Sequence, residues 1–330
     1  MKLIITGGRQ SNSSLSYFNK EWSNGICGVV YEYDTKNNNL EEKVNYKTPL
    51  KFRPKENFSI SFKSGSIYEN KLYITTLTEV LIYSLPKYTL EERISLKIFN
   101  DLHHVIKHNN DLYIVVTGLD IVVRYSLSKK KVLFIYNCFP EVDTWNRFDK
   151  KKDYRKINTT KPHFSHPNHV TIYNDKLYIT RYKQQDVLVY SLQGKIINNI
   201  ILNQGIPHDG CIFNNKFIYT VVNGKIIEIN KNNFNEKKII DLNKFQNDNK
   251  SLGWCRGFQK INSKNYVAFS RIRPTKFIEN VKWLGNKLSD KVKLKMPTRL
   301  VCYDENYSRL LKEINLEDYG INWIFSILKN

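Results

Sequence analysis

Three histidines stand at matching places in a repeated sequence, and their side chains suit acid–base catalysis or metal binding. His104 opens the segment HVIKHNNDLYIVV, His169 opens HVTIYNDKLYIT, and His208 opens HDGCIFNNKFIYT. Asp209 shares the register of His104 and His169, so His208 lies one residue earlier in its repeat. A neutral imidazole can take a proton as a general base or bind a divalent metal ion. We expect His104, His169 and His208 to be catalytic, or to hold one divalent metal ion together with Asp209.

A second group combines arginine with aromatic side chains. Some of its members follow segments of the KLYIT type, and others open or follow strands of the last repeat. A guanidinium group binds carboxylate, phosphate or sulfate through two hydrogen bonds, and Tyr or Trp beside it can stack on a sugar or a base. The predicted substrate-binding residues are Arg181, Tyr182, Trp254, Arg256, Arg271 and Arg273.

Both groups also have a structural interpretation. Each histidine could be a hydrogen-bonded residue at a strand end, and each arginine could pair with Asp or Glu. The histidines are far apart in sequence, so their spacing does not define a metal site as a short Cys-x-x-Cys pattern would. Their matching repeat positions favour a functional role, because the scaffold itself would bring them together.

The elements that carry these residues are short strands. Residues 168–192 contain three runs that alternate apolar and polar side chains and are rich in Val, Ile, Tyr and Thr, with a turn at Asn174-Asp175. Similar segments cover 64–85, 104–127 and 208–229, and a more diverged one starts at Arg256. A period of about 40 residues with four strands per unit is typical of β-propeller blades.

The two ends of the chain predict how the ring closes. The chain begins on a second-strand motif, MKLIITGG, whose first strand is missing there, and WIFSIL at 323–328 supplies a candidate. We therefore expect an all-β fold, a single six-bladed propeller over residues 1–330, in which the last strand pairs beside the first. Closure removes free sheet edges.

Three long insertions are expected on one face of this propeller, at 8–27, 138–168 and 273–298. They fall in the two types of link that share a face, whereas the links of the opposite face are tight turns. Loops elaborated on one face of a rigid scaffold mark the working face.

Composition narrows the class of protein. No run of 18 apolar residues occurs, so no membrane span is expected, and MKLIITGGRQ is better interpreted as a strand than as a signal peptide. The five cysteines are odd in number and show no paired spacing, which favours reduced thiols in the cytoplasm.

The net charge of +21 attracts polyanions. Nucleic acid is possible but not favoured, because no Lys/Arg block interleaved with aromatics marks a groove.

The repeated K-L-Y-I-T…V-L-V-Y-S-L…G-K-I pattern resembles six-bladed propellers of the NHL, gluconolactonase and streptogramin-lyase kind over nearly the whole chain. The segments HDG at 208–210, WCRG at 254–257 and SRIR at 270–273 also resemble an uncharacterised bacterial propeller family. Gluconolactonase-like members imply an axial divalent cation with oxygen ligands, for which Asn168 and Asp209 are the candidates. Streptogramin-lyase-like members imply a mouth histidine as base.

Two functions remain open at this point. The first is a lyase or hydrolase that acts on an anionic small molecule or an acidic glycan at an axial His/Arg site. The second is a non-catalytic binding module for a glycan, peptide or protein partner.

Overall fold

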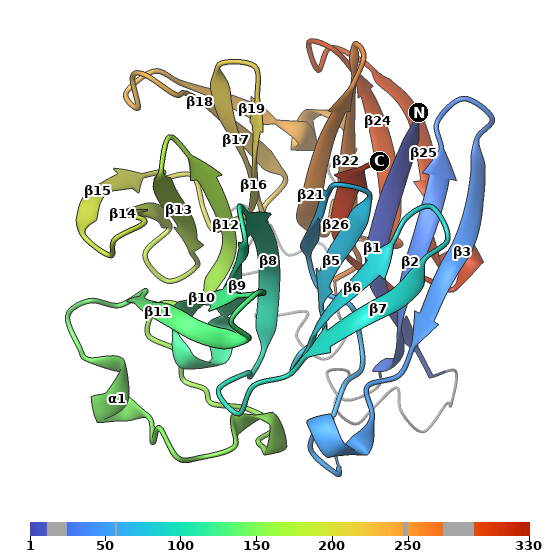
Figure 1. The fold of residues 1–330 in the computed structure, drawn as a ribbon. Coiled ribbons are helices and arrows are strands. Elements are labelled where there is room, and N and C mark those ends of the chain that lie inside the picture. The colour runs from blue at the N-terminus through green and yellow to red at the C-terminus, as the bar shows by residue number, and fades with distance from the viewer. Residues whose placement is uncertain (12–24, 57, 247–249, 273–293) are drawn as a thin grey trace.

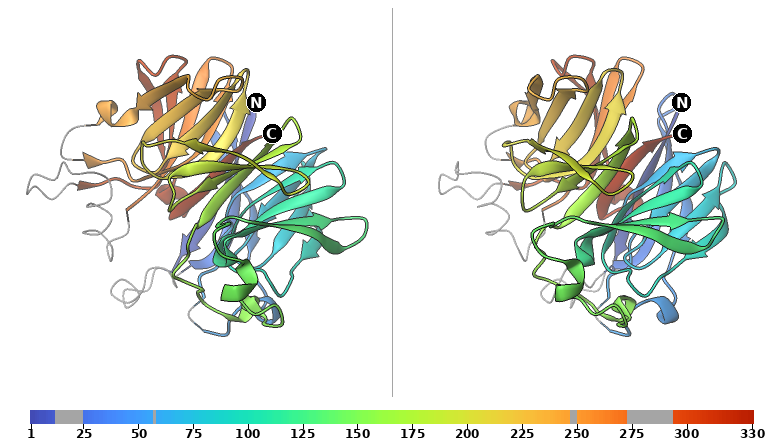
Figure 2. Two further views of the ribbon diagram at one scale, coloured as in Figure 1. Left: turned by 90° about the vertical axis from the view of Figure 1, so that its left-hand side faces the viewer. Right: turned by 60° about the vertical axis from the view of Figure 1, so that its left-hand side comes forward.

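Six four-stranded antiparallel sheets stand in a ring around a central axis (Figure 1), and Figure 2 shows the same sheets from two other sides. The computed structural model describes residues 1–11, 25–56, 58–246, 250–272 and 294–330. The predicted all-β, six-bladed propeller is confirmed. The blades, each written from its inner to its outer strand, are β26 (Trp323–Lys329), β1 (Lys2–Gln10), β2 (Gly25–Asp34), β3 (Asn39–Tyr46); β4 (Gly65–Tyr68), β5 (Lys71–Thr75), β6 (Val80–Ser84), β7 (Thr89–Ile94); β8 (Leu102–His108), β9 (Asp111–Val116), β10 (Ile121–Ser126), β11 (Lys131–Asn137); β12 (Pro167–Tyr173), β13 (Lys176–Arg181), β14 (Asp186–Ser191), β15 (Ile196–Ile201); β16 (Pro207–Phe213), β17 (Lys216–Val221), β18 (Lys225–Asn230), β19 (Lys237–Asp241); and β21 (Trp254–Ile261), β22 (Lys264–Ser270), β24 (Arg299–Asp304), β25 (Leu310–Asn315).

The ring closes as the sequence predicts. Strand β26 pairs antiparallel with β1, so that Leu3 lies opposite Lys329 and Gly8 lies opposite Trp323. One blade therefore contains both ends of the chain, and its backbone hydrogen bonds hold the ring shut. The side chains of β26 that face the neighbouring blades are buried, including Ile324 and Ile327.

Adjacent blades are joined by apolar cores and by a recurring hydroxyl bond. Each core cluster contains residues of neighbouring sheets, as where Tyr113 and Val115 pack with Val170 and Ile179. At the end of the ring where the inner strands begin, which we call the mouth, a buried hydroxyl at the end of a second strand donates to a backbone carbonyl of the next blade. The four pairs are Thr6 to Lys63 (2.7 Å), Thr117 to Pro167 (2.6 Å), Thr180 to His208 (3.2 Å) and Ser270 to Ile324 (2.7 Å).

The predicted insertion at 138–168 lies entirely within the described residues and leads to the mouth. It runs from the end of β11 to the start of β12 and contains α1 (Thr144–Arg147) and the short 3-10 helix η5 (Tyr154–Lys156). Figure 1 shows α1 at the lower end of the propeller, away from the two termini. The side-chain amide of Asn100 donates to the carbonyls of Tyr154 (2.9 Å) and Ile157 (2.7 Å), which ties this insertion to blade three.

The other two insertions differ from the prediction or fall outside the described residues. The insertion predicted at 8–27 is shorter, because β1 runs to Gln10 and β2 begins at Gly25, where Arg9 still pairs with Cys27. Residues 12–24 lie outside the described part. Most of the insertion at 273–298 does too; its end contributes β23 (Leu294–Lys295), which pairs in parallel with β20 (Lys250–Ser251).

Two general features of the sequence can be placed in this fold. All five cysteines are free thiols, and four of them are buried. In the described part of the chain, no helix is long and apolar enough to cross a membrane.

Candidate functional site

In five of the six blades, the inner strand has one extra residue at the mouth. The pairing with the second strand shifts between Leu102 and His104 in β8, and the same irregularity recurs at the mouth ends of β12, β16, β21 and β26. Such β-bulges bend a strand and redirect a side chain, and they are frequent beside active sites. Because of the bulge, two consecutive residues of the same inner strand can both face the axis.

The bulges create two layers of residues around the axis. The outer layer, which we call the mouth ring, consists of Lys63, His103, Asn168, His208, Arg256 and Phe325. The next residue of each strand forms the inner ring: Ser64, His104, His169, Asp209, Gly257 and Ser326. The predicted register of the three histidines is therefore correct: His104, His169 and Asp209 share the inner ring, and His208 lies in the mouth ring.

Phe325 forms the centre of the mouth ring. The centroid of its ring lies 4.0 Å from Nζ of Lys63 and 4.6 Å from Cζ of Arg256. The rings of His103 and His208 lie 6.4 Å from it on other sides. Two cations, two imidazoles and one aromatic ring from five blades thus meet at one point.

Arg256 is a buried cation that forms no ion pair with a carboxylate of the described residues. Its side chain is only 6% exposed and lies against the rings of Trp254 and Phe325, at 4.9 and 4.6 Å. Among the described residues no carboxylate oxygen lies within 4.0 Å of it, and Nε has no hydrogen-bond partner. Burial lowers the pKa of Arg256 to about 10, against the opposing charge of Asp209, so the group stays charged near neutral pH.

His208 is held by the carboxylate of the residue that follows it. Nδ1 of His208 donates to Oδ1 of Asp209 at 2.8 Å, and Oδ2 of Asp209 accepts the backbone N–H of Gly257. Burial lowers the pKa of His208, and the positive charges of Arg256 and Lys63 lower it further, while Asp209 opposes them. The imidazole is therefore neutral at pH 7, with Nε2 as its proton-accepting atom.

In the inner ring, His104 has no nitrogen left for the predicted axial metal site. His104 and His169 stack with their ring centroids 3.7 Å apart and their planes 32° apart. Nε2 of His104 donates to the carbonyl of Gly65 (3.1 Å), and Nδ1 accepts the N–H of Val170 (3.4 Å). Both nitrogens of His104 are thus occupied by backbone groups, which is the structural role that the sequence left open. Stacked rings also do not direct two nitrogens at one ion.

A cavity of about 340 Å³ extends from the inner ring along the inner strands, toward the tight turns at the far end. His104, His169 and Asp209 line it together with apolar residues such as Ile106 and Ile172. The residues of the mouth ring do not line this cavity. The charged groups and the cavity are therefore on opposite sides of the inner ring.

Two of the predicted substrate-binding arginines have protein partners. Arg181 is 4% exposed and forms a two-pronged ion pair with Asp186, from Nε at 2.8 Å and from Nη2 at 2.5 Å, while Nη1 donates to the carbonyl of Cys138. Arg271 bonds Glu317 at 3.3 Å and the side chain of Gln10. These two guanidinium groups hold the scaffold together. Arg273 lies outside the described residues.

Tyr182 and Trp254, by contrast, lie at the mouth. The ring of Tyr182 is 5.0 Å from that of His166, and its backbone N–H donates to the carbonyl of His166. Burial raises the pKa of Tyr182 to about 12, although the charge of Arg256 works against this shift. The ring of Trp254 lies 4.9 Å from Cζ of Arg256.

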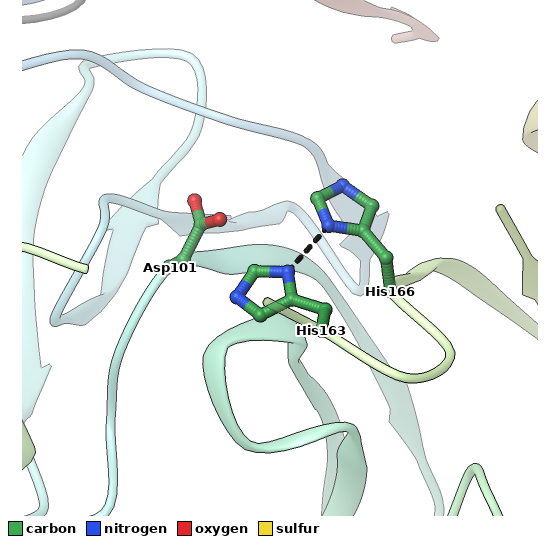
Figure 3. A group of neighbouring side chains, drawn as sticks. All are labelled: Asp101, His163 and His166. Carbon is green, nitrogen blue, oxygen red and sulfur yellow. Dashed lines mark hydrogen bonds between the residues drawn. The ribbon is translucent and has the colours of Figure 1, made fainter. Parts of the chain in front are cut away.

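A group that the sequence analysis did not assign to the site also lies here. Asp101, His163 and His166 each offer one ligand atom, and these atoms all lie within 4.8 Å of one another. Figure 3 shows the three side chains near one another, with the two histidines on one loop and Asp101 on another segment. The only sequence signal was the spacing of His163 and His166, three residues apart in the insertion before β12.

Comparison with known proteins supports the fold. No protein-family model matches the chain, and no curated protein sequence matches it. A protein of unknown function from Bacteroides caccae is similar over 99% of this chain and 98% of its own, with a TM-score of 0.62 and 10% identity. A chain of a nidogen/laminin complex is similar over 99% and 98%, with a TM-score of 0.59 and 8% identity. A streptogramin B lyase is similar over 87% of this chain and 76% of its own, with a TM-score of 0.50 and 12% identity. At these identities the likeness concerns the fold alone.

Proposed function

We propose that the mouth ring binds a small anionic molecule or an acidic glycan, and that His208 acts on it as the general base of a lyase or hydrolase. The observation that carries this proposal is the buried guanidinium of Arg256, which has no carboxylate partner in the described part of the chain. A buried charge without a partner is costly to the fold, and a ligand that neutralises it recovers that energy.

The chemistry of Arg256 selects the ligand class. A guanidinium group binds a carboxylate, sulfate or phosphate with two parallel hydrogen bonds, and this interaction is strong where water is excluded. Lys63, which is 4% exposed and shares the ring of Phe325, adds a second positive charge. Trp254 and Tyr182 place two aromatic side chains beside these cations.

His208 and Asp209 supply the base. The bond from Nδ1 to the carboxylate fixes the tautomer, so that Nε2 carries the lone pair. In a lyase, Nε2 takes the proton next to the substrate carboxylate, a carbon–carbon double bond forms, and the bond to the leaving oxygen breaks; that oxygen takes up a proton from water, and His208 later releases its proton to water. Arg256 would stabilise the charge that grows on the carboxylate. In a hydrolase, Nε2 takes a proton from water instead.

A binding module without catalysis remains the second candidate, because the cationic part of the mouth ring needs no base to hold an acidic glycan or peptide. For the inner ring, the stack of His104 on His169 favours a role without catalysis, because His104 bonds only backbone groups.

The test starts from anionic probes: oligosaccharides of glucuronate and galacturonate, their neutral counterparts, and inorganic phosphate. Binding is measured by calorimetry and turnover by product analysis, for the wild type, Arg256→Met, His208→Gln, and Arg271→Met as a control on the same face. We expect Arg256→Met to lose binding, Arg271→Met to keep it, and His208→Gln to keep binding but lose turnover. Equal binding by Arg256→Met and the wild type would show that the anion site is wrong. Binding without turnover in the wild type would favour the module.

A further inference from the structure

The cluster of Asp101, His163 and His166 lies at the mouth but uses none of the groups assigned above to anion binding. Asp101 precedes β8, and the two histidines belong to the insertion before β12, so the cluster joins blade three to the insertion (Figure 3). Nδ1 of His163 lies 2.7 Å from Nδ1 of His166. At this distance one nitrogen donates to the other; a metal ion bound to both would replace that proton, and the nitrogens would move apart to about 3.3 Å.

The hydrogen bonds around His163 leave its Nδ1 as the lone-pair atom. The hydroxyl of Thr160 donates to the carbonyl of Gly118, so it must accept from Nε2 of His163, which lies 3.3 Å away. A metal-binding histidine is normally held in this way, by a second partner on its other nitrogen that sets the tautomer.

The insertion is built to hold these histidines in place. The carboxylate of Asp120 is fully buried and accepts three successive backbone N–H groups, from Phe164 (2.8 Å), Ser165 (3.0 Å) and His166 (2.6 Å). Arg147 of α1 neutralises the same carboxylate at 2.9 Å. The turn that carries His166 is therefore fixed by a group outside the cluster.

The backbone at two of the three residues is in a sparsely populated conformation. Asp101 has φ = 49° and His166 has φ = 55°, and each lies two residues before its mouth-ring residue. Non-glycine residues in the left-handed region are uncommon, and they gather at functional sites when the surrounding structure holds them there. Both bends lie where a side chain turns toward the cluster.

The carboxylate of Asp101 lies in two long ion-pair contacts but in no short one among the described residues. It lies 3.7 Å from Nδ1 of His103 and 3.8 Å from Nζ of Lys63, and both distances are longer than a hydrogen bond. His103 instead donates from Nδ1 to the backbone carbonyl of Asp101, at 2.9 Å. The carboxylate thus keeps lone pairs for another cation.

We propose that Asp101, His163 and His166 form a binding site for one divalent transition-metal ion of the zinc type. Two imidazole nitrogens and one carboxylate suit Zn²⁺ and its neighbours, whereas Mg²⁺ and Ca²⁺ prefer ligand sets made of oxygen. Three protein ligands leave a coordination position for water or for a ligand of the mouth. This inference goes beyond the proposed function and does not depend on it, because other side chains carry it.

The test titrates metal-stripped full-length protein with ZnCl2 in a calorimeter, with MgCl2 as the contrast. The variants are Asp101→Asn, His163→Gln, His166→Gln and Thr160→Val, and the control is His108→Gln, at the far end of β8. We expect one tight Zn²⁺ site in the wild type and in the control. Each ligand variant should lose more than about 100-fold in affinity, and Thr160→Val about 10- to 100-fold.

Asp101→Asn is the decisive variant, because it leaves the histidine pair intact but removes the ligand from the other loop. If it binds Zn²⁺ as the wild type does, the pair acts alone and the proposed site is wrong. Loss of the metal only in His208→Gln would move the site to the mouth ring and also overturn the proposal. Circular dichroism identifies variants that do not fold; for these, a Zn²⁺-induced rise in Tm in the wild type that is smaller in Thr160→Val replaces the titration. If the wild type shows no Zn²⁺-induced rise in Tm, the proposed site is wrong.

Discussion

His208 and Asp209 are neighbours in sequence, yet Nδ1 of the first donates to Oδ1 of the second at 2.8 Å. Consecutive residues of a regular strand point to opposite faces, so this bond would not form there. The extra residue in β16, between the pairs Pro207–Val221 and Gly210–Tyr219, lets both side chains face the axis. A local irregularity of one strand thus creates the base–carboxylate pair.

This pair makes a prediction that needs no substrate. In the wild type, the carboxylate keeps the His208 proton on Nδ1. An amide at position 209 can donate instead of accept, so Asp209→Asn should move the proton to Nε2. The nitrogen-15 chemical shifts of the His208 ring report the tautomer, with His108 as the internal reference. An unchanged Nδ1–H tautomer in Asp209→Asn would contradict the assigned role of Asp209.

Arg256→Met should not destabilise the protein. The substitution removes a buried charge without a carboxylate partner among the described residues, and the methionine side chain fills similar space between Trp254 and Phe325. Replacing buried charges by apolar groups of similar volume is neutral or stabilising. We expect the free energy of unfolding, measured in urea, to stay the same or rise by about 1–2 kcal/mol. A loss of more than about 1 kcal/mol would mean that Arg256 supports the fold rather than a ligand.

Arg181→Met should destabilise the protein, in contrast to Arg256→Met. Here the substitution leaves the buried carboxylate of Asp186 without its two-pronged partner. Breaking one side of a buried ion pair costs about 3–5 kcal/mol. The urea midpoint should therefore fall strongly in Arg181→Met, and a variant as stable as the wild type would show that the pair contributes nothing.

His104 makes stability depend on pH. Burial lowers its pKa to about 4, while the unfolded chain has the ordinary value near 6.5. Between these two pH values the unfolded state therefore binds more protons than the folded state. The contribution of His104 to the free energy of unfolding is complete above pH 6.5 and is lost as the pH falls toward 4. The slope is up to about 1.4 kcal/mol per pH unit for this one group.

The measurement for His104 is the urea midpoint between pH 8 and pH 4.5, in the wild type and in His104→Gln. The variant should show a flatter profile below about pH 6.5. Parallel profiles would mean that His104 is protonated in the folded protein as well.

Asp120 should control the order of the insertion. Its carboxylate accepts the backbone N–H groups of Phe164, Ser165 and His166. Bonds to a charged acceptor contribute about 1.5–3 kcal/mol. In Asp120→Asn, hydrogen exchange at these three amides should speed up by about 10- to 100-fold, whereas the amides of β17 should not change. Unchanged exchange at all three would mean that other contacts hold the loop.

The sequence by itself determined the architecture. The alternation of apolar and polar residues, the repeated KLYIT segments and the strand motifs at the two ends of the chain predicted the blades and the closure between β26 and β1. These are local or periodic signals, and each follows from burying one face of a short strand against the next. The register of His104, His169 and Asp209 followed from the same repeat.

Only the tertiary structure decided which of these groups are free to act. Arg181 and Arg256 look alike in sequence, but Arg181 meets Asp186 across a β-hairpin whereas Arg256 lies between two aromatic rings. The bond between His104 and the carbonyl of Gly65, unlike the Arg181–Asp186 pair within one hairpin, is a contact between blades. Asp101 and His163 meet because Asn100 and Asp120 fix the insertion against the neighbouring blade. Partners of a side chain that come from other blades leave no periodic trace in the chain, so residue type and spacing could not reveal them.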